Sequence, residues 1–320
     1  MLAPLVGRIY DHAPQQNAFP LAVRNKQREL LTFFRDPPQT DERYSRLFAP
    51  EFDQERAARQ RVEDLWTATK DYLDADVQSA APNDFLGRFW EMYLAAGLLT
   101  KLQLIPSAQR KLRAGGPDMA VVSPAAFVEA IAARPGTGKD AVTEAEMFVV
   151  RDVPVAQITL RLRAAIEEKT RKHAGYVAKK ILTPSDPYVI GINGSGVPST
   201  RGEPDVPWII KSVFPLGNRV IHLDRETLKT IGESHEPEHD IIKASGASVS
   251  KDIFLGQSHA GISAIVYCWV DEYNMPSGPG CDFIVVHNPF ATNPIAHGVL
   301  PAGLECWLEG DHVRLERRDG

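Results

Sequence analysis

The chain has 320 residues, of which 43% are hydrophobic and 24% are charged, so it holds enough apolar side chains for one large core or two smaller ones. The formal net charge of −5 excludes a general electrostatic attraction to nucleic acid, and binding to a polyanion would need a local basic patch. No run approaches the roughly 18 apolar residues that a membrane helix needs, so we expect no membrane partner.

The cysteine pattern is typical of a reducing compartment. Cys268, Cys281 and Cys306 show no CxxC or CxxxC spacing, which predicts neither a disulfide framework nor a zinc site. The opening residues MLAPLVGRIYDHAP lack a basic leader followed by a long apolar run. We therefore expect a cytoplasmic protein.

The first part of the chain, residues 1–80, is polar and interrupted by prolines, with helical periodicity near 24–35 and 53–75. We interpret it as an N-terminal helical region. Its helices are compatible with a homodimer contact or a substrate-reading arm, and equally with packing on the core.

Residues 81–195 alternate between helical and strand patterns. The segment DFLGRFWEMYLAAGLLTKL, which starts at Asp84, is apolar on nearly every face, as is typical of a buried helix. The elements expected after it are a short apolar stretch at 102–106, strands at 118–123 and 126–132, a helix at 156–181 and a buried strand at 187–192. This order of helix, two or three strands, helix and strand predicts an α/β fold.

The remainder, residues 196–320, is rich in loops. Its patterns predict a short helix near 224–232 and strands at 261–270 and 282–287. We interpret it as a β-rich C-terminal extension that continues the same sheet.

Two lone acids lie in the apolar segment GGPDMAVVSPAAFVEA, residues 115–130. A turn at Ser123-Pro124 predicts that Asp118 faces Glu129 across a hairpin. Residues directly opposed in this way point to the same face, with Cβ atoms about 4.5–5.5 Å apart. Two carboxylates this close repel each other, and a divalent cation between them would remove the conflict.

A third acid, Glu91, lies in the apolar helix that precedes this hairpin. It is the only acid between Asp84 and Asp118, and a buried carboxylate is costly unless it is paired or bound to a metal. Oxygen-only ligands suit Mg²⁺ or Mn²⁺. We therefore predict a metal site formed by Glu91, Asp118 and Glu129.

Each of these acids has a simpler interpretation. Glu91 can form an ion pair with Arg88 one turn earlier on the helix. Asp118 follows Gly-Gly-Pro and can serve as a turn residue.

The helix with an inward Glu91, the strand that begins Pro117-Asp118, the strand that carries Glu129, and the following helix and strand resemble the αβββαβ core of the PD-(D/E)XK nuclease superfamily. The segments RFWEMYL, GPDMAVV and FVEAIA and the lysine-bearing helix are similar to a bacterial group within it. The resemblance spans residues 84–192. It implies a restriction-endonuclease-like fold with a mixed sheet, and a Mg²⁺-dependent nuclease that hydrolyses phosphodiester bonds. Its implied partner is nucleic acid, DNA rather than RNA.

The sequence departs from the superfamily at one position. The superfamily has a lysine two residues after the second acid, where it orients the attacking water and stabilises developing charge, and here that position is Ile131. Some members take the lysine from the next helix, and we expect Lys169 and Lys172 to replace it.

That next helix carries further polar and basic residues. Lys169, Lys172, Tyr176 and Lys180 recur with helical spacing and are expected to share a face. Five more residues of this helix predict a basic surface able to hold a phosphate backbone. They are Arg161, Arg163, Arg171, His173 and Lys179. The alternative is a helix face that is simply solvated.

Two other functions stay open. Ile131 in the lysine position favours a catalytically inactive member of the same fold that binds nucleic acid or a protein partner. The segment HEPEH matches the H-E-x-x-H motif of zinc hydrolases through His235, Glu236 and His239, but that motif needs a helix, which Pro237 would break.

Overall fold

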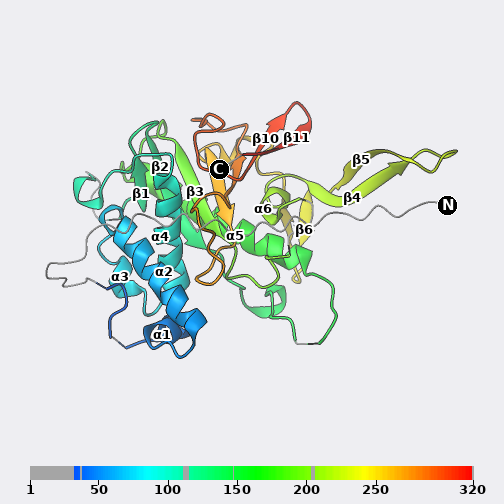
Figure 1. The fold of residues 1–320 in the computed structure, drawn as a ribbon. Helices are drawn as coiled ribbons and strands as arrows, with labels where there is room; N and C mark the ends of the chain where they lie inside the picture. The colour runs from blue at the N-terminus through cyan, green and yellow to red at the C-terminus, as the bar shows by residue number, and fades with distance from the viewer. Residues whose placement is uncertain (1–31, 37, 111–114, 147, 203–205, 319–320) are drawn as a thin grey trace, which may run out of the picture. The chain divides into compact units, whose positions relative to one another are not determined.

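A mixed sheet with helices on both faces organises the chain (Figure 1). The computed structural model describes residues 32–36, 38–110, 115–146, 148–202 and 206–318. Residues 33–320 form one compact unit. The α/β class expected from the sequence is confirmed, whereas the specific restriction-endonuclease-like core stays a prediction.

The helices before the sheet pack through aromatic side chains. They are α1 (Glu42–Phe48), α2 (Asp53–Thr69), the 3₁₀ turn Lys70–Tyr72, α3 (Val77–Ala80) and α4 (Phe85–Leu99). Asp41 caps α1 by accepting hydrogen bonds from the backbone N–H groups of Arg43 and Tyr44. The rings of Phe33, Tyr44 and Phe85 meet at centroid distances of 6.3–6.5 Å, and this contact joins α1 to the start of α4.

The pattern at 53–75 is confirmed as α2 followed by a 3₁₀ turn. Most of the helix expected near 24–35 lies outside the described residues. In the part of the chain that the structure describes, no helix is both long and apolar enough to cross a membrane.

Helix α4 is buried against the sheet, as its apolar sequence predicts. The side chain of Trp90 is fully buried, and its Nε1 donates a 3.0 Å hydrogen bond to the carbonyl of Gly191. A Cβ on Gly191 would lie 2.3 Å from Cδ2 of Leu94, so glycine lets the helix approach this strand closely.

The sheet contains seven strands within the described residues, in the order β1-β2-β3-β8-β9-β10-β11. Their bounds are β1 Met119–Val121, β2 Ala126–Ala132, β3 Tyr188–Asn193, β8 Ala264–Cys268, β9 Ile284–His287, β10 Leu304–Glu309 and β11 His312–Arg317. Helix α5 (Val155–Ala178) connects β2 to β3, which run parallel. The expectation that β8 and β9 continue the sheet is confirmed, whereas β10 and β11 were not predicted.

The predicted hairpin register is confirmed. Strand β1 pairs antiparallel with β2, and Ala120 lies opposite Phe127. Leu104 adds an isolated antiparallel bridge to Val121 on the other side of β1, in the short apolar stretch expected at 102–106.

Successive side chains on the strands enter two cores. In β3, Val189 joins the core on the α4 face, whereas Ile190 and Ile192 join the core beneath α5. This division is what a strand with a repeat of two residues produces when both faces are covered.

The segment between β3 and β8 contains small elements. They are α6 (Trp208–Lys211), β4 (Leu216–Leu223), β5 (Thr230–Pro237), β6 (Asp240–Ile242), β7 (Ser248–Ser250) and three-residue 3₁₀ turns, here at Gln257–His259 and elsewhere at Ser107–Gln109 and Gly138–Asp140. The helix predicted near 224–232 is wrong, because these residues form the β4–β5 hairpin. Asp224 accepts a hydrogen bond from Thr227 N–H at 2.7 Å, and Leu228 has φ of 54°, which closes a turn instead of extending a helix.

Candidate active site

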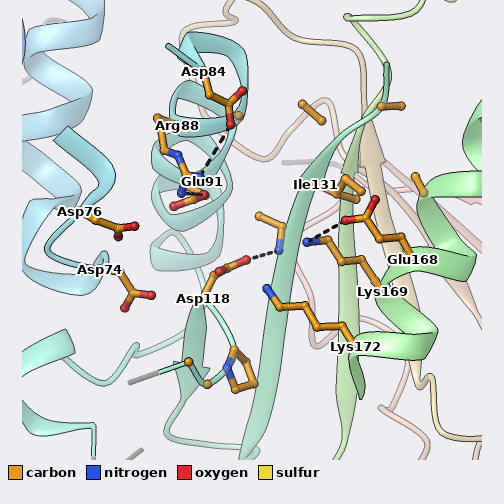
Figure 2. A pocket seen from close by; sticks show the side chains of 18 of the residues that line it. Asp74, Asp76, Asp84, Arg88, Glu91, Asp118, Ile131, Glu168, Lys169 and Lys172 are labelled. Atoms are coloured by element: carbon orange, nitrogen blue, oxygen red, sulfur yellow. Dashed lines mark hydrogen bonds and ion pairs between the residues drawn. The ribbon is translucent and has the colours of Figure 1, made fainter. Parts of the chain in front are cut away.

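A cavity of about 890 Å³ opens beside β2, between α4 and α5 (Figure 2). Strand β1 pairs only with residues 126–128 of β2, so the following residues of β2 face the cavity along that edge. The charged residues that line it are Asp74, Asp76, Asp84, Glu91, Asp118 and Glu168, and Arg88, Arg110, Arg134, Arg161, Lys169 and Lys172. Acidic side chains that could bind a cation and basic side chains that could bind an anion therefore line the same cavity.

Asp118 lies at the uncovered edge of β2. Its Oδ2 accepts a 2.7 Å hydrogen bond from the backbone N–H of Ala130, which holds the carboxylate beside the strand. Burial and then the charge of Glu129 raise the pKa of Asp118 to about 6, against the opposing effect of that hydrogen bond and the lysines. The site therefore disfavours the negative charge that Asp118 carries.

Glu91 enters the cavity from α4. Nη1 of Arg88 lies 2.6 Å from Oε1 of Glu91, so the ion pair proposed as its simpler interpretation is present. Burial and then the charge of Asp118 nevertheless raise the pKa of Glu91 well above its usual value, and Arg88 offsets only part of this. Glu91 and Asp118 thus repel each other within one cavity.

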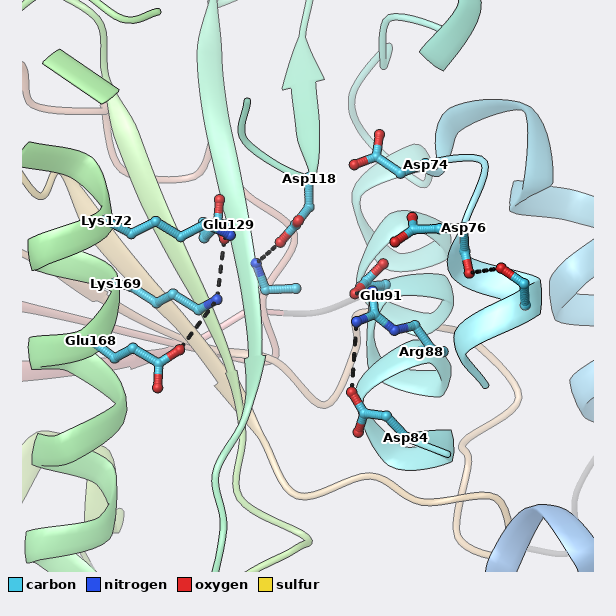
Figure 3. Close-up of polar contacts among 12 residues, drawn as sticks. Asp74, Asp76, Asp84, Arg88, Glu91, Asp118, Glu129, Glu168, Lys169 and Lys172 are labelled. Carbon is cyan, nitrogen blue, oxygen red and sulfur yellow. Dashed lines mark hydrogen bonds and ion pairs between the residues drawn. The ribbon is translucent and has the colours of Figure 1, made fainter. Parts of the chain in front are cut away.

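Glu129 extends from β2 toward α5, whereas Asp118 lies on the opposite side of the strand (Figure 3). Its side chain is fully buried, and Nζ of Lys169 lies 3.1 Å from Oε1. Lys172 contacts the same oxygen. Tyr176 places its hydroxyl 3.1 Å from Oε2 of Glu129 and 3.1 Å from the carbonyl of Gly116. The three α5 residues that the helical spacing places on one face therefore meet at this acid.

The two lysines differ in exposure. The Lys169 side chain is 9% exposed, whereas the Lys172 side chain is 42% exposed. Burial lowers the pKa of Lys172, but the charge of Glu129 and its hydrogen bond outweigh burial and raise the pKa. Lys172 thus stays charged at neutral pH and lies partly open to the cavity.

Tyr188 adds a buried group that sequence reasoning did not identify. Its hydroxyl is buried with no hydrogen-bond partner among the described residues. Burial and then the charge of Glu129 raise its pKa, which places it close to this acid. The signal in the sequence was a polar aromatic residue at the start of an otherwise apolar strand.

The three predicted metal ligands do not form one cluster. Among the described residues, no group of three His, Cys, Asp or Glu side chains is arranged to hold a metal ion together. Glu91 and Asp118 line the cavity, whereas Glu129 does not. The metal site built on all three acids therefore stays a prediction.

The local basic surface predicted for α5 does not include all of its five residues. Arg161 lines the cavity, whereas Arg163 is buried elsewhere, where its Nε donates to the carbonyl of Ser250 at 2.9 Å. Arg171 is exposed. Lys180 follows the helix end in a left-handed conformation with φ of 56°, so it does not share the face of Lys169.

The HEPEH segment lies on β5 and the residues that follow it, not on a helix. His235 is opposite Arg219 in the hairpin, and Nδ1 of His239 lies 3.4 Å from Asp252. Glu236 points to the opposite face of the strand from His235, and His239 lies beyond the end of β5 at Pro237, so the zinc-hydrolase alternative lacks the geometry that it requires.

A second set of hydrogen-bonded polar side chains connects α5 to the segment before β8, outside the cavity. His259 places Nε2 2.9 Å from Oε1 of Glu167, and its Nδ1 lies 2.9 Å from the hydroxyl of Ser258. The hydrogen bond from His259 lowers the pKa of Glu167 to about 2, helped by Arg163 and opposed by burial.

Comparisons of the chain with models of known protein families, with curated proteins and with solved structures give no match. Membership of the PD-(D/E)XK superfamily therefore stays a prediction from the sequence.

Proposed function

We propose that this chain is a metal-dependent nuclease that hydrolyses phosphodiester bonds in nucleic acid, with DNA as the expected substrate. One observation carries the proposal: Lys169 and Lys172 of α5 both contact Glu129, the acid whose strand lacks the expected lysine. Lys169 or Lys172 would therefore supply the amine that Ile131 does not provide.

The cavity fits a divalent cation. Glu91 and Asp118 line it, and each raises the cost of the other's charge. Oδ2 of Asp118 accepts the hydrogen bond from Ala130, and Oδ1 is the oxygen that would meet a cation. Oxygen ligands of this kind are those that Mg²⁺ and Mn²⁺ prefer. Glu91 and Asp118 would hold the cation, whereas Glu129 keeps its contacts with Lys169 and Lys172.

The bound cation would neutralise the carboxylates and polarise a phosphoryl oxygen. Lys172 is charged and partly exposed to the cavity, so it would stabilise the negative charge that grows on the phosphate in the transition state. Glu129 holds Lys172 in place, and the buried Lys169 balances the charge of Glu129. Lys172 acts here as a fixed charge, because its raised pKa prevents it from accepting a proton near pH 7.

A second function, nucleic-acid binding without cleavage, is favoured by a different observation. Glu129 is fully buried, and lysines and Tyr176 engage both of its oxygens. In this function Glu129 serves as the buried partner of a structural ion pair, and the cavity keeps its basic residues for binding alone.

The test incubates the protein with double-stranded DNA, single-stranded DNA and RNA in Mg²⁺, Mn²⁺ or EDTA. We expect cleavage with metal, none in EDTA, and a loss of at least about 100-fold in Asp118→Asn and Lys172→Gln. Asp311→Asn is the matched control, since it makes the same charge change in the β10–β11 turn. Absence of cleavage with either metal on all three substrates would contradict the nuclease and favour the second function.

A further inference from the structure

Arg161 differs from the other basic residues of the cavity. It lines the cavity from α5 without a carboxylate partner, and its Nε, like that of Arg88, is buried with no hydrogen-bond partner among the described residues. A buried donor that lacks an acceptor costs free energy. An anionic ligand in the cavity would supply the acceptor.

The remaining cavity cations are paired with carboxylates. The pairs are Arg88 with Glu91, Arg110 with Asp74, Arg134 with Asp84, and Lys169 and Lys172 with Glu129. Among the described residues that line the cavity, Arg161 is the cation without a carboxylate partner. Its planar guanidinium can donate two parallel hydrogen bonds, which matches the geometry of a phosphate.

The loop after β2 holds Arg161 in position. Gly136 lines the same cavity, and a Cβ on it would lie 2.0 Å from Nη1 of Arg161. Gly136 has φ of 81°, a conformation that glycine adopts without strain. The backbone therefore packs directly on the guanidinium and limits its movement.

Arg161 and Lys172 are too far apart on α5 for one phosphate to contact both. Eleven residues of helix separate their Cα atoms by about 16 Å along the axis. In duplex DNA each strand carries one phosphate per about 3.4 Å along the helix axis, so this distance corresponds to about four or five nucleotides of a duplex that lies along α5. A nucleic-acid strand that lies along α5 would satisfy both ends of the cavity.

We propose that Arg161 binds a backbone phosphate of the nucleic-acid strand, several nucleotides from the phosphate that lies nearest Lys172. This inference rests on the proposed function for the class of ligand. It adds that the substrate is a strand with several phosphates instead of a mononucleotide or free phosphate.

The test measures equilibrium binding by fluorescence anisotropy in EDTA, where no metal-dependent cleavage occurs. The probes are labelled DNA and RNA strands of about ten nucleotides and a labelled dinucleotide, with lengths chosen to exceed or fall short of the four or five nucleotides above. The variants are Arg161→Gln and Arg161→Lys. Arg171→Gln is the matched control, because it removes the same charge from an exposed position of the same helix.

We expect Arg161→Gln to weaken binding of the long strand by about tenfold, the loss of one charged hydrogen-bonding group. The slope of log affinity against log salt should fall in magnitude by about 0.7 to 0.9, the value for one phosphate contact. Arg161→Lys should recover most of the affinity, Arg171→Gln should bind like wild type, and binding of the dinucleotide should not change.

Three results would overturn the inference: wild-type affinity in Arg161→Gln, an equal loss in Arg171→Gln, or an equal loss for the dinucleotide. Titration with inorganic phosphate tests whether Arg161 forms a site for free phosphate. If Arg161→Gln weakens the binding of phosphate alone and not of the strands, the assignment to a strand is also contradicted. Wild type that binds through Arg161 but never cleaves would contradict the proposed function and leave this inference standing. Cleavage with unchanged binding in Arg161→Gln would do the opposite, and failure to bind any probe would overturn both.

Discussion

Lys172 of α5 contacts Oε1 of Glu129 in β2, although 43 positions separate the two residues in the chain. The contact brings a partly exposed charged side chain to a fully buried acid. It also connects the helix that lines one side of the cavity to the strand that forms its floor.

The two lysines at Glu129 should have different roles. Lys169→Met removes a buried partner of Glu129 and should lower the free energy of unfolding by about 3 kcal/mol. Lys172→Met removes a partly exposed amine and should cost less stability but most of the cleavage activity. Urea unfolding and cleavage assays on both variants check this. Equal losses of stability would contradict the division, and Glu129→Gln should restore part of the stability of Lys169→Met because it removes a buried charge that has lost one of its two lysine partners.

Divalent metal should stabilise the protein through Asp118. A ligand that binds only the folded state raises stability by about 2.7 kcal/mol at 100 times its Kd, and Mg²⁺ or Mn²⁺ also relieves the repulsion between Asp118 and Glu91. We expect metal to raise the Tm of wild type and of Asp311→Asn, but not of Asp118→Asn. Differential scanning fluorimetry with and without EDTA measures the shift. The same shift in Asp118→Asn would place the metal elsewhere.

Glu167 should make stability depend on acid pH. Its folded pKa of about 2 lies below the ordinary value of 4.5, so the unfolded state binds more protons between these values. The contribution of Glu167 is therefore present above pH 4.5 and lost as pH falls toward 2. Glu167→Gln should lower the Tm at pH 7 and flatten its fall in this window.

Thermal unfolding followed by circular dichroism across this pH range checks the prediction for Glu167. The control is Glu168→Gln, which alters the next residue of the same helix, where the side chain is 60% exposed. An identical pH profile in Glu167→Gln and wild type would show that the contact with His259 contributes nothing to stability.

The histidines of HEPEH should be dispensable for metal-dependent cleavage. His235 and His239 lie on and after a strand instead of on one helix face. We expect His235→Ala and His239→Ala to cleave DNA at the wild-type rate, and Mn²⁺ but not Zn²⁺ to restore activity after EDTA treatment. Loss of activity in both variants together with recovery by Zn²⁺ would instead support the zinc hydrolase.

Local patterns were sufficient to predict the elements around the cavity. The apolar sequence of α4 predicts its burial, because a helix without a polar face cannot lie against water. The pairing of Ala120 with Phe127 follows from the position of the turn and the two-residue repeat of a strand. Local patterns failed at 224–232, where Asp224 and the left-handed Leu228 close a hairpin. They also missed β10 and β11, whose alternating polar residues give a weak strand signal.

The residues available to the site could be identified from the amino-acid sequence alone: two acids in a hairpin, a lone acid in a buried helix, and Lys169, Lys172 and Tyr176 on one helix face. These follow from spacing within single elements. How they combine could not be predicted in this way, because contacts between elements depend on how the helices pack on the sheet. That packing places both lysines at Glu129, leaves Glu91 and Asp118 together in the cavity, and leaves Arg161 without a carboxylate partner among the described residues.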